Sequence, residues 1–216
     1  MVLSGLGSAA SGAVAATPAP PVSAPSALVL EASTGDVAYA KQPDRRRAIA
    51  STTKLMTALL VLEQTKGSTV FRGARYRALP VESKIDLRAG ERMSVADLLR
   101  ALLIESANDA AVTLAEGVSG SRSAFVAEMN KRAQELGLKN THYSNPIGLD
   151  TAGNYSTARD LARLTLRLRR WLPQRRQLCR TLREKFAPEF LQRGKAAFHL
   201  SHCRGSALSH LRRPRL

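Results

Sequence analysis

The chain has 216 residues, of which 44% are hydrophobic, so it is long enough for one globular domain with a proper core. Its formal net charge of +16 is unevenly placed: residues 1–162 hold 18 Lys or Arg against 15 Asp or Glu, whereas residues 163–216 hold 15 against 2. The excess positive charge therefore belongs to one end, which excludes reading the whole chain as a polycation for anionic partners.

The first 26 residues carry no charge and are rich in small residues and proline. Met1–Ala16 is small and apolar, and Ala13–Ala16 has the composition of a signal-peptide cleavage site, although the positive leading region is missing. We interpret residues 1–26 as a signal-peptide remnant followed by a Pro-rich linker; a disordered Ala/Gly terminus is the alternative. The first interpretation predicts an exported protein, in the periplasm or on the outer face of the cytoplasmic membrane.

A hairpin follows the linker. Residues 27–32 and 37–40 have the composition of strands, and residues 33–36, which include a glycine and an aspartate, form the turn between them. Two strands make an unfinished sheet, because a lone hairpin is only marginally stable in water. A basic connection over residues 44–47 then leads into a helix that begins at about Ala50.

Helices dominate the rest of the chain, after a loop or short strand over residues 67–79. Ser94 and Asp97 form a capping pattern, Gly137 ends a helix as its C′ residue, and Ser156 is the predicted cap of the last helix. Further helices are predicted over about 95–105, 109–116, 123–136 and from 156 onward, with a loop-rich stretch over 141–155.

One short motif stands at the start of the first helix. Ser51 and Lys54 are three residues apart, so both side chains lie on the same helical face. A lysine whose pKa is lowered can take the proton of a serine hydroxyl and make it a nucleophile. The apolar residues that follow indicate that this helix is buried inside a domain, where a charged lysine is unusual and points to a function. The alternative is that Ser51 is a helix cap and Lys54 a solvated side chain.

A second polar group, Ser106-Ala107-Asn108, lies between two predicted helices. Alone it is typical of a structural loop or cap. Paired with the first motif it gains a chemical meaning: the Ser106 hydroxyl could relay a proton, and the Asn108 amide could hold a substrate amide through its donor and acceptor.

These motifs stand within a long ordered set of family-like segments. The two most specific are Ala50-Ser51-Thr52-Thr53-Lys54-Leu55-Met56-Thr57 and Ser106-Ala107-Asn108-Asp109-Ala110-Ala111; the others are 27–31, 87–91, 125–130, 136–138, 141–146, 148–150 and 155–160. Over about residues 26–168 the chain resembles the serine-type D-alanyl-D-alanine carboxypeptidases, the low-molecular-weight penicillin-binding proteins.

The resemblance implies an α/β (α+β) fold of the β-lactamase/transpeptidase type, with a helical cluster on an antiparallel sheet. It implies that Ser51 is the acylated nucleophile, Lys54 its general base, Ser106 the proton relay and Asn108 a substrate-binding residue. The implied reaction removes the terminal D-Ala from the pentapeptide stem of peptidoglycan through an acyl-enzyme. β-Lactams would acylate the same serine, and neither a metal nor an organic cofactor is implied.

The sequence departs from the family in its last part. The family has a third motif, Lys-Thr-Gly, on a sheet strand that helps to bind the substrate carboxylate and supplies one oxyanion-hole N–H; no such tripeptide occurs here. The C-terminal sheet strands also have no counterpart. We therefore expect residues 27–168 to be an incomplete carboxypeptidase domain, from a truncated or frameshifted reading frame. Such a chain should be poorly stable and a poor carboxypeptidase, or a catalytically dead protein that binds peptidoglycan stems.

Residues 169–216 form a basic tail without a recognisable family pattern. Both cysteines, Cys179 and Cys203, and three of the four histidines lie in this tail, but their spacing fits no metal site. The main body has no cysteine, which suits an exported protein without disulfides. The functional alternative is that the tail binds an anionic membrane surface or nucleic acid, although nothing in it indicates a specific nucleic acid.

Overall fold

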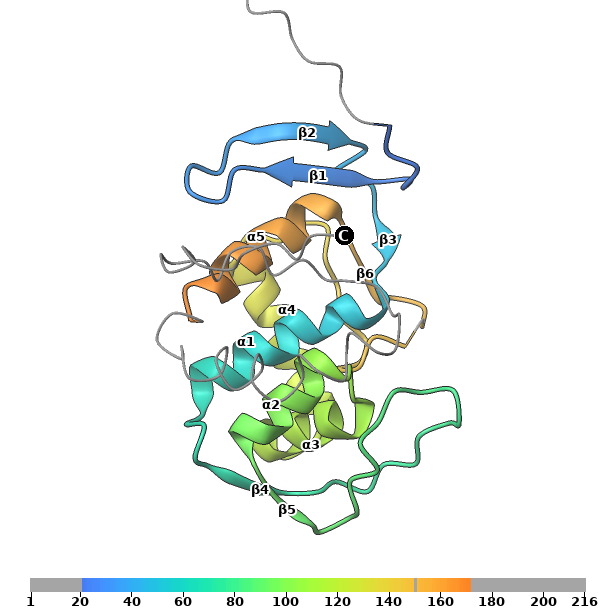
Figure 1. Ribbon diagram of the computed structural model, residues 1–216, viewed down its shortest axis with the longest axis vertical. Helices are drawn as coiled ribbons and strands as arrows, with labels where there is room; N and C mark the ends of the chain where they lie inside the picture. Colours follow the sequence, from blue (N-terminus) through green and yellow to red (C-terminus); the bar gives the residue numbers. More distant parts are fainter. Residues whose placement is uncertain (1–20, 150, 172–216) are drawn as a thin grey trace, which may run out of the picture. The chain divides into compact units, whose positions relative to one another are not determined.

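The computed structural model describes residues 21–149 and 151–171, which all belong to one compact unit spanning Met1–Gln174 (Figure 1). The predicted signal-peptide remnant, the first part of the Pro-rich linker and the tail beyond Trp171, with both cysteines, lie outside the described residues. In chain order the elements are β1 (Ala27–Leu30), β2 (Val37–Lys41), β3 (Arg47–Ala48), the 3₁₀ helix η1 (Ala50–Thr53), α1 (Lys54–Gln64), β4 (Val70–Arg72), β5 (Arg92–Ser94), α2 (Val95–Ile104), α3 (Asn108–Ser119), α4 (Arg122–Glu135), β6 (Tyr155–Ser156) and α5 (Ala158–Arg169).

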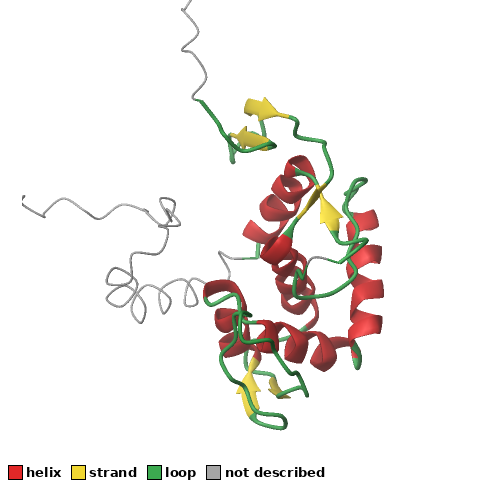
Figure 2. Ribbon diagram, turned by 90° about the vertical axis from the view of Figure 1, so that its right-hand side faces the viewer, coloured by secondary structure: helices red, strands yellow, loops and turns green. Residues whose placement is uncertain are grey.

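The described strands form three antiparallel pairs, β1–β2, β3–β6 and β4–β5. The predicted hairpin is confirmed as β1–β2, in which Ala27 pairs with Lys41 and an irregularity falls between Val29 and Leu30. β1 also contacts α5. The pairs β3–β6 and β4–β5 join segments that are far apart in sequence, so local patterns could not predict them. Figure 2 shows these short strand pairs at separate places around the helices, not joined into one sheet.

Helix α1 lies at the centre of the helical cluster. It packs against α2, α3, α4 and α5, and its residues from Met56 to Leu62 are all buried. The prediction that this helix belongs inside the domain is therefore confirmed. Since α1 is apolar on most sides, burial of this whole stretch removes a large hydrophobic surface from water.

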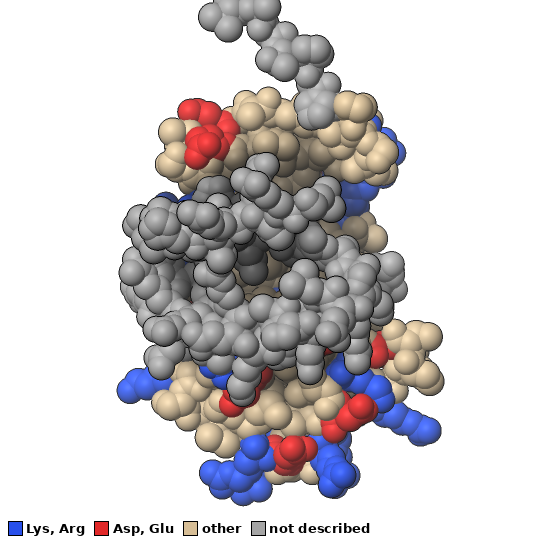
Figure 3. All heavy atoms as spheres, in the orientation of Figure 1, with Lys and Arg blue, Asp and Glu red and all other residues tan. Residues whose placement is uncertain are grey.

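On the face that Figure 3 shows, the charged residues over the lower part of the unit are mixed rather than grouped by sign. Figure 3 shows Lys and Arg interspersed with Asp and Glu over α2, β4 and β5, where Arg100 pairs with Asp97. This balance agrees with the small net charge of residues 1–162 in the sequence.

Two predicted helix ends are confirmed and one cap is wrong. The Ser94 side chain accepts a hydrogen bond from the Asp97 N–H at 3.1 Å, and Gly137, with φ of 67°, follows the C-cap of α4. The cap of α5 is Thr157, whose hydroxyl accepts from the Asp160 N–H at 3.1 Å. Ser156 lies instead in β6, and its hydroxyl is hydrogen-bonded to Thr141 at 2.7 Å.

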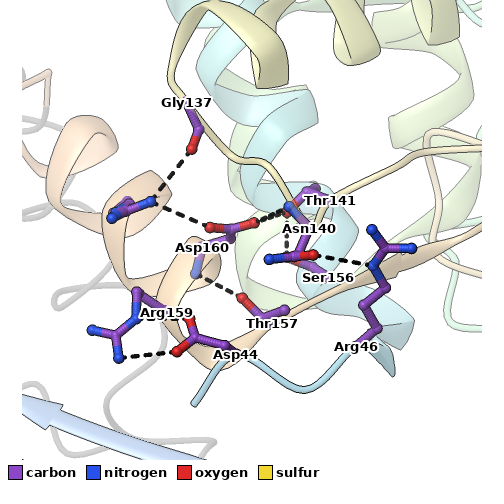
Figure 4. Close-up of polar contacts among 10 residues, drawn as sticks. Asp44, Arg46, Gly137, Asn140, Thr141, Ser156, Thr157, Arg159 and Asp160 are labelled. Atoms are coloured by element: carbon purple, nitrogen blue, oxygen red, sulfur yellow. Dashed lines mark hydrogen bonds and ion pairs between the residues drawn. The ribbon is translucent and has the colours of Figure 1, made fainter.

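Asp160 fixes the start of α5 to the rest of the unit (Figure 4). Its carboxylate is 3% exposed and accepts hydrogen bonds from the Asn140 N–H and the Thr141 hydroxyl, both at 2.9 Å. Arg163 approaches its other oxygen at 3.7 Å. Nearby on the surface, Arg159 pairs with Asp44 at 2.7 Å. The buried carboxylate thus has two hydrogen-bond donors on one oxygen and a cation near the other, and such compensation is what burial of a charge requires.

Candidate active site

Ser51 lies in η1, one turn before Lys54 opens α1. The preceding residue, Ala50, has φ of 43°, a left-handed conformation that is uncommon for a residue with a side chain. Gly148, with φ of 86°, packs directly against this turn. A Cβ at position 148 would lie 2.0 Å from the Ala50 carbonyl oxygen. Only glycine fits this approach, so the loop around Gly148 sets the backbone that carries Ser51.

The loop that reaches Ser51 is ordered by Asn145. The Asn145 side-chain oxygen accepts from the N–H groups of Ile147 at 3.2 Å and Gly148 at 2.7 Å. Helix α1 holds the same loop, because the Thr57 hydroxyl donates to the Pro146 carbonyl at 2.8 Å. These contacts present the Ile147 carbonyl to α1.

Lys54 is 3% exposed, and among the described residues its ammonium has only uncharged acceptors. The Nζ donates to the Ile147 carbonyl oxygen at 2.7 Å and to the Ser51 Oγ at 3.2 Å. Desolvation by burial lowers the pKa of Lys54 to about 8, partly opposed by the negative charge of Glu82. A lysine with such a pKa is partly neutral near physiological pH and can accept a proton from the hydroxyl that it contacts.

Ser106 is the second hydroxyl at Ser51. It lies between α2 and α3 with φ of 55°, and its Oγ is 2.9 Å from the Ser51 Oγ. The left-handed conformation is unusual for serine and costs free energy, so the surrounding structure must hold it. Ser51 is therefore flanked by Lys54 on one side and by Ser106 on the other.

Asn108, the first residue of α3, lies apart from this hydrogen-bonded trio. Its side chain is 6% exposed, and its Nδ2 donates to the Glu82 carboxylate at 2.7 Å. The structure thus brings Lys54 and Ser106 within hydrogen-bond distance of Ser51, and it joins the fourth predicted residue to a carboxylate that the sequence did not single out.

Glu82 is the residue that sequence reasoning missed. Besides Asn108, its carboxylate accepts hydrogen bonds from the Tyr76 hydroxyl and from the Leu79 N–H, the latter at 3.0 Å. Desolvation tends to raise the pKa of Glu82, but the hydrogen bonds from Tyr76, Leu79 and Asn108, with the charge of Lys54, hold it below its usual value. Nothing in the local sequence distinguishes Glu82 from a solvated loop residue. Gly148 carried a weak signal, as the glycine after Asn145-Pro146.

Within residues 21–149 and 151–171, no three His, Cys, Asp or Glu side chains are grouped so that they could hold a metal ion. None of the helices described is both long and apolar enough to cross a membrane.

Comparison with known proteins identifies the family. The model of the D-alanyl-D-alanine carboxypeptidase family, peptidase family S11, matches residues 13–197. The chain belongs to this family. Its fold is similar to those of solved proteins: penicillin-binding protein 5 from Haemophilus influenzae matches with a TM-score of 0.69 and 36% identity, over 74% of this chain and 48% of that one. The Streptomyces K15 DD-transpeptidase matches with a TM-score of 0.67 and 31% identity, over 71% and 63%. The predicted β-lactamase/transpeptidase-like α+β fold is confirmed.

The sequence relatives are all named for D-alanyl-D-alanine peptidase activity, but the named reactions differ. The D-alanyl-D-alanine carboxypeptidase DacF of Bacillus subtilis is 46% identical over 64% of this chain and 37% of its own length. A D-alanyl-D-alanine endopeptidase of Pseudomonas aeruginosa is 39% identical over 74% of this chain and 54% of its own. The chain therefore spans only about half or less of the length of these relatives.

Proposed function

We propose that this chain acts as a serine-type D-alanyl-D-alanine carboxypeptidase on peptidoglycan pentapeptide stems. The observation that carries the proposal is the placement of Ser51 Oγ within hydrogen-bond distance of both a desolvated lysine and a second hydroxyl, at 3.2 and 2.9 Å. A nucleophile, a base and a relay in one contact network are what acyl transfer requires. Membership of the family supports the same substrate class.

In the proposed mechanism, neutral Lys54 accepts the Ser51 proton while Ser51 Oγ attacks the carbonyl carbon of the D-Ala-D-Ala bond. The protonated Lys54 returns this proton through Ser106 to the leaving amine as the C–N bond breaks, and the terminal D-Ala departs. Water then attacks the acyl-enzyme while neutral Lys54 takes its proton and passes it to Ser51 Oγ as the acyl bond breaks, which regenerates Ser51. Asn108 holds the amide of the stem peptide, so that the reacting carbonyl stays near Ser51.

The absence of Lys-Thr-Gly from the sequence favours one second candidate, a protein that binds stem peptides without turnover. Loss of one oxyanion-hole donor alone costs about 10²–10³ in rate. Binding of an anionic membrane surface or nucleic acid through residues 169–216 is a third candidate, and that tail lies outside the described residues beyond Trp171.

A labelled penicillin tests the site directly. We expect mass spectrometry to find the label on Ser51 and a Ser51→Ala variant to take up none, whereas Ser33→Ala, a change in the β1–β2 turn, should label normally. A label on another residue would reject the assignment of Ser51. Release of D-Ala from a pentapeptide then separates carboxypeptidase from stem binder: binding without release supports the second candidate. Salt-dependent binding to DNA or anionic vesicles that disappears on deletion of residues 172–216 supports the third.

We also propose export, which the Ala-rich start and Pro-rich linker of the sequence support. The mature protein recovered outside the cytoplasm should then begin near Thr17. Recovery of protein with intact Met1 from the cytosol alone would contradict this.

A further inference from the structure

Glu82 accepts hydrogen bonds from three separate donors beside the candidate active site. These are the Tyr76 hydroxyl, the Leu79 N–H at 3.0 Å and the Asn108 Nδ2 at 2.7 Å. From this geometry we propose that Glu82 is a positioning residue that fixes the orientation of the Asn108 amide, and so sets how the site recognises an amide in its substrate. The inference rests on the proposed function and assigns to that site a residue that the Ser51 and Ser106 motifs do not contain.

The chemistry of the contact allows only one orientation of Asn108. An ionised carboxylate has no proton to donate, so only the NH₂ end of an amide can face it. Turning the Asn108 amide over would place its carbonyl oxygen against the Glu82 carboxylate and lose a charge-assisted hydrogen bond. The NH₂ end of Asn108 also lies within hydrogen-bond reach of the Tyr76 hydroxyl oxygen. With that end held there and at Glu82, the amide directs its carbonyl oxygen away from both, and this oxygen complements the N–H of a peptide amide.

The segment that carries Glu82 is attached to the same helical turn as Asn108. The Asn108 N–H donates to the Ser83 carbonyl at 2.8 Å. The neighbouring Asp109 carboxylate, 5% exposed, accepts from the N–H groups of Ile85 at 3.1 Å and Leu87 at 2.9 Å. Asn108 lies on the first turn of α3, and the segment that follows Glu82 is hydrogen-bonded to the same turn. The Glu82–Asn108 contact is therefore preorganised before substrate arrives.

Two β-lactams separate orientation of Asn108 from the chemistry at Ser51. Benzylpenicillin carries an acyl amide beside its reactive ring, whereas 6-aminopenicillanic acid lacks that amide. In Glu82→Gln, whose side chain can face either end of the Asn108 amide, we expect the ratio of the two acylation rate constants to fall about tenfold, the scale of one hydrogen bond. The rate constant for 6-aminopenicillanic acid should change much less. Tyr76→Phe, which removes one donor from Glu82, should shift the ratio in the same direction by a smaller factor.

Glu91→Gln is the matched control. Glu91 lies in the same connecting segment and accepts a backbone N–H, from Arg88 at 3.0 Å, but it has no contact with Asn108 among the described residues. In Glu91→Gln, the ratio of the two acylation rate constants should equal that of the unchanged protein. Glu82→Asp, which keeps the charge, should recover part of the discrimination that Glu82→Gln loses.

A second measurement does not depend on catalysis. The side-chain NH₂ resonance of Asn108 should shift in Glu82→Gln and stay unchanged in Glu91→Gln. An unchanged acylation ratio or an unchanged resonance in Glu82→Gln overturns the inference. If the unchanged protein is acylated by neither compound, the proposed function is overturned, while the resonance still decides whether Glu82 orients Asn108.

Discussion

Two buried ionisable residues in this protein, Lys54 and Asp160, are each 3% exposed but differ in the partners that surround their charges. The Asp160 carboxylate has a backbone N–H and a hydroxyl at 2.9 Å and an arginine at 3.7 Å. The Lys54 ammonium has a carbonyl oxygen and the Ser51 hydroxyl, and no carboxylate within ion-pair distance among the described residues. One charge is compensated and the other is not.

The difference separates a structural role from a chemical one. A buried charge that is fully paired holds elements together, and Asp160 joins α5 to the segment after α4. A buried charge with neutral partners is costly, and the cost appears as the lowered pKa of Lys54. Sites that perform acid–base chemistry keep such destabilising buried groups, because replacing the group would abolish the activity.

The largest expected effect comes from Lys54→Met. Without a base at Ser51, acylation by penicillin should fall by about 10³-fold or more, the upper range for general base catalysis. The free energy of unfolding should stay the same or rise, because an uncompensated buried charge is replaced by an apolar side chain of similar length. Stopped-flow acylation and urea unfolding measure the two quantities. A variant that loses acylation because it has unfolded would contradict the comparison with Asp160.

Gly148→Ala should come next. A Cβ would meet the Ala50 carbonyl at 2.0 Å and displace the turn that carries Ser51. Because a misplacement of about 1 Å can cost about 10²-fold in rate, we expect acylation to fall by about that factor. Gly35→Ala is the matched control, since Gly35 has the same φ of 86° but a Cβ there would contact nothing within 4 Å. Its acylation rate should be unchanged; an equal loss in both variants would show that the contact at Gly148 does not position Ser51.

Asp160→Ala should act on stability instead. It leaves the Asn140 N–H and the Thr141 hydroxyl without their acceptor, which should lower the free energy of unfolding by about 3 kcal/mol. The acylation rate of the protein that stays folded should be unchanged. Asp44→Ala, which breaks the exposed pair with Arg159, serves as control and should leave the urea midpoint where it was. Equal urea midpoints for the two variants would show that Asp160 does not have this structural role.

A pH dependence follows from the burial of Lys54. The pKa of Lys54 is about 8 in the folded protein against 10.5 for an ordinary lysine, so between these values the unfolded chain binds more protons. Stability contributed by this group must therefore rise with pH from about 8 to about 10.5. The difference in unfolding free energy between the unchanged protein and Lys54→Met should change in that window, and the acylation rate should rise as pH passes 8. A flat difference would mean that burial does not lower the pKa.

Local patterns predicted the parts of the fold whose causes are local. The hairpin β1–β2, the cap at Ser94 and the C′ glycine at position 137 each follow from a few neighbouring residues. The cap of α5 was placed one residue early, because two hydroxyl residues are adjacent; Asp160, three residues after Thr157, was the signal that distinguishes them.

For the site, the sequence predicted the contact between Ser51 and Lys54 because three residues on a helix share a face. The contact with Ser106 was expected from the family resemblance, and the structure supplies its distance. The Ile147 carbonyl and Glu82 could not be predicted, because a backbone oxygen and a loop carboxylate gain their roles only when the chain folds, and Gly148 gave only a weak signal. The catalytic roles themselves stay predictions.

The span of the Lys54–Ile147 hydrogen bond has a consequence for the order of folding. It joins residues 93 positions apart, and the Ser106–Ser51 contact joins residues 55 apart, whereas the turns and helices around them form from near neighbours. Closing such long loops costs entropy before the contacts repay it, so distant contacts form slowly. During refolding, the ability to be acylated should therefore return after the helical circular dichroism signal, and a labelled penicillin would mark the final stage of assembly.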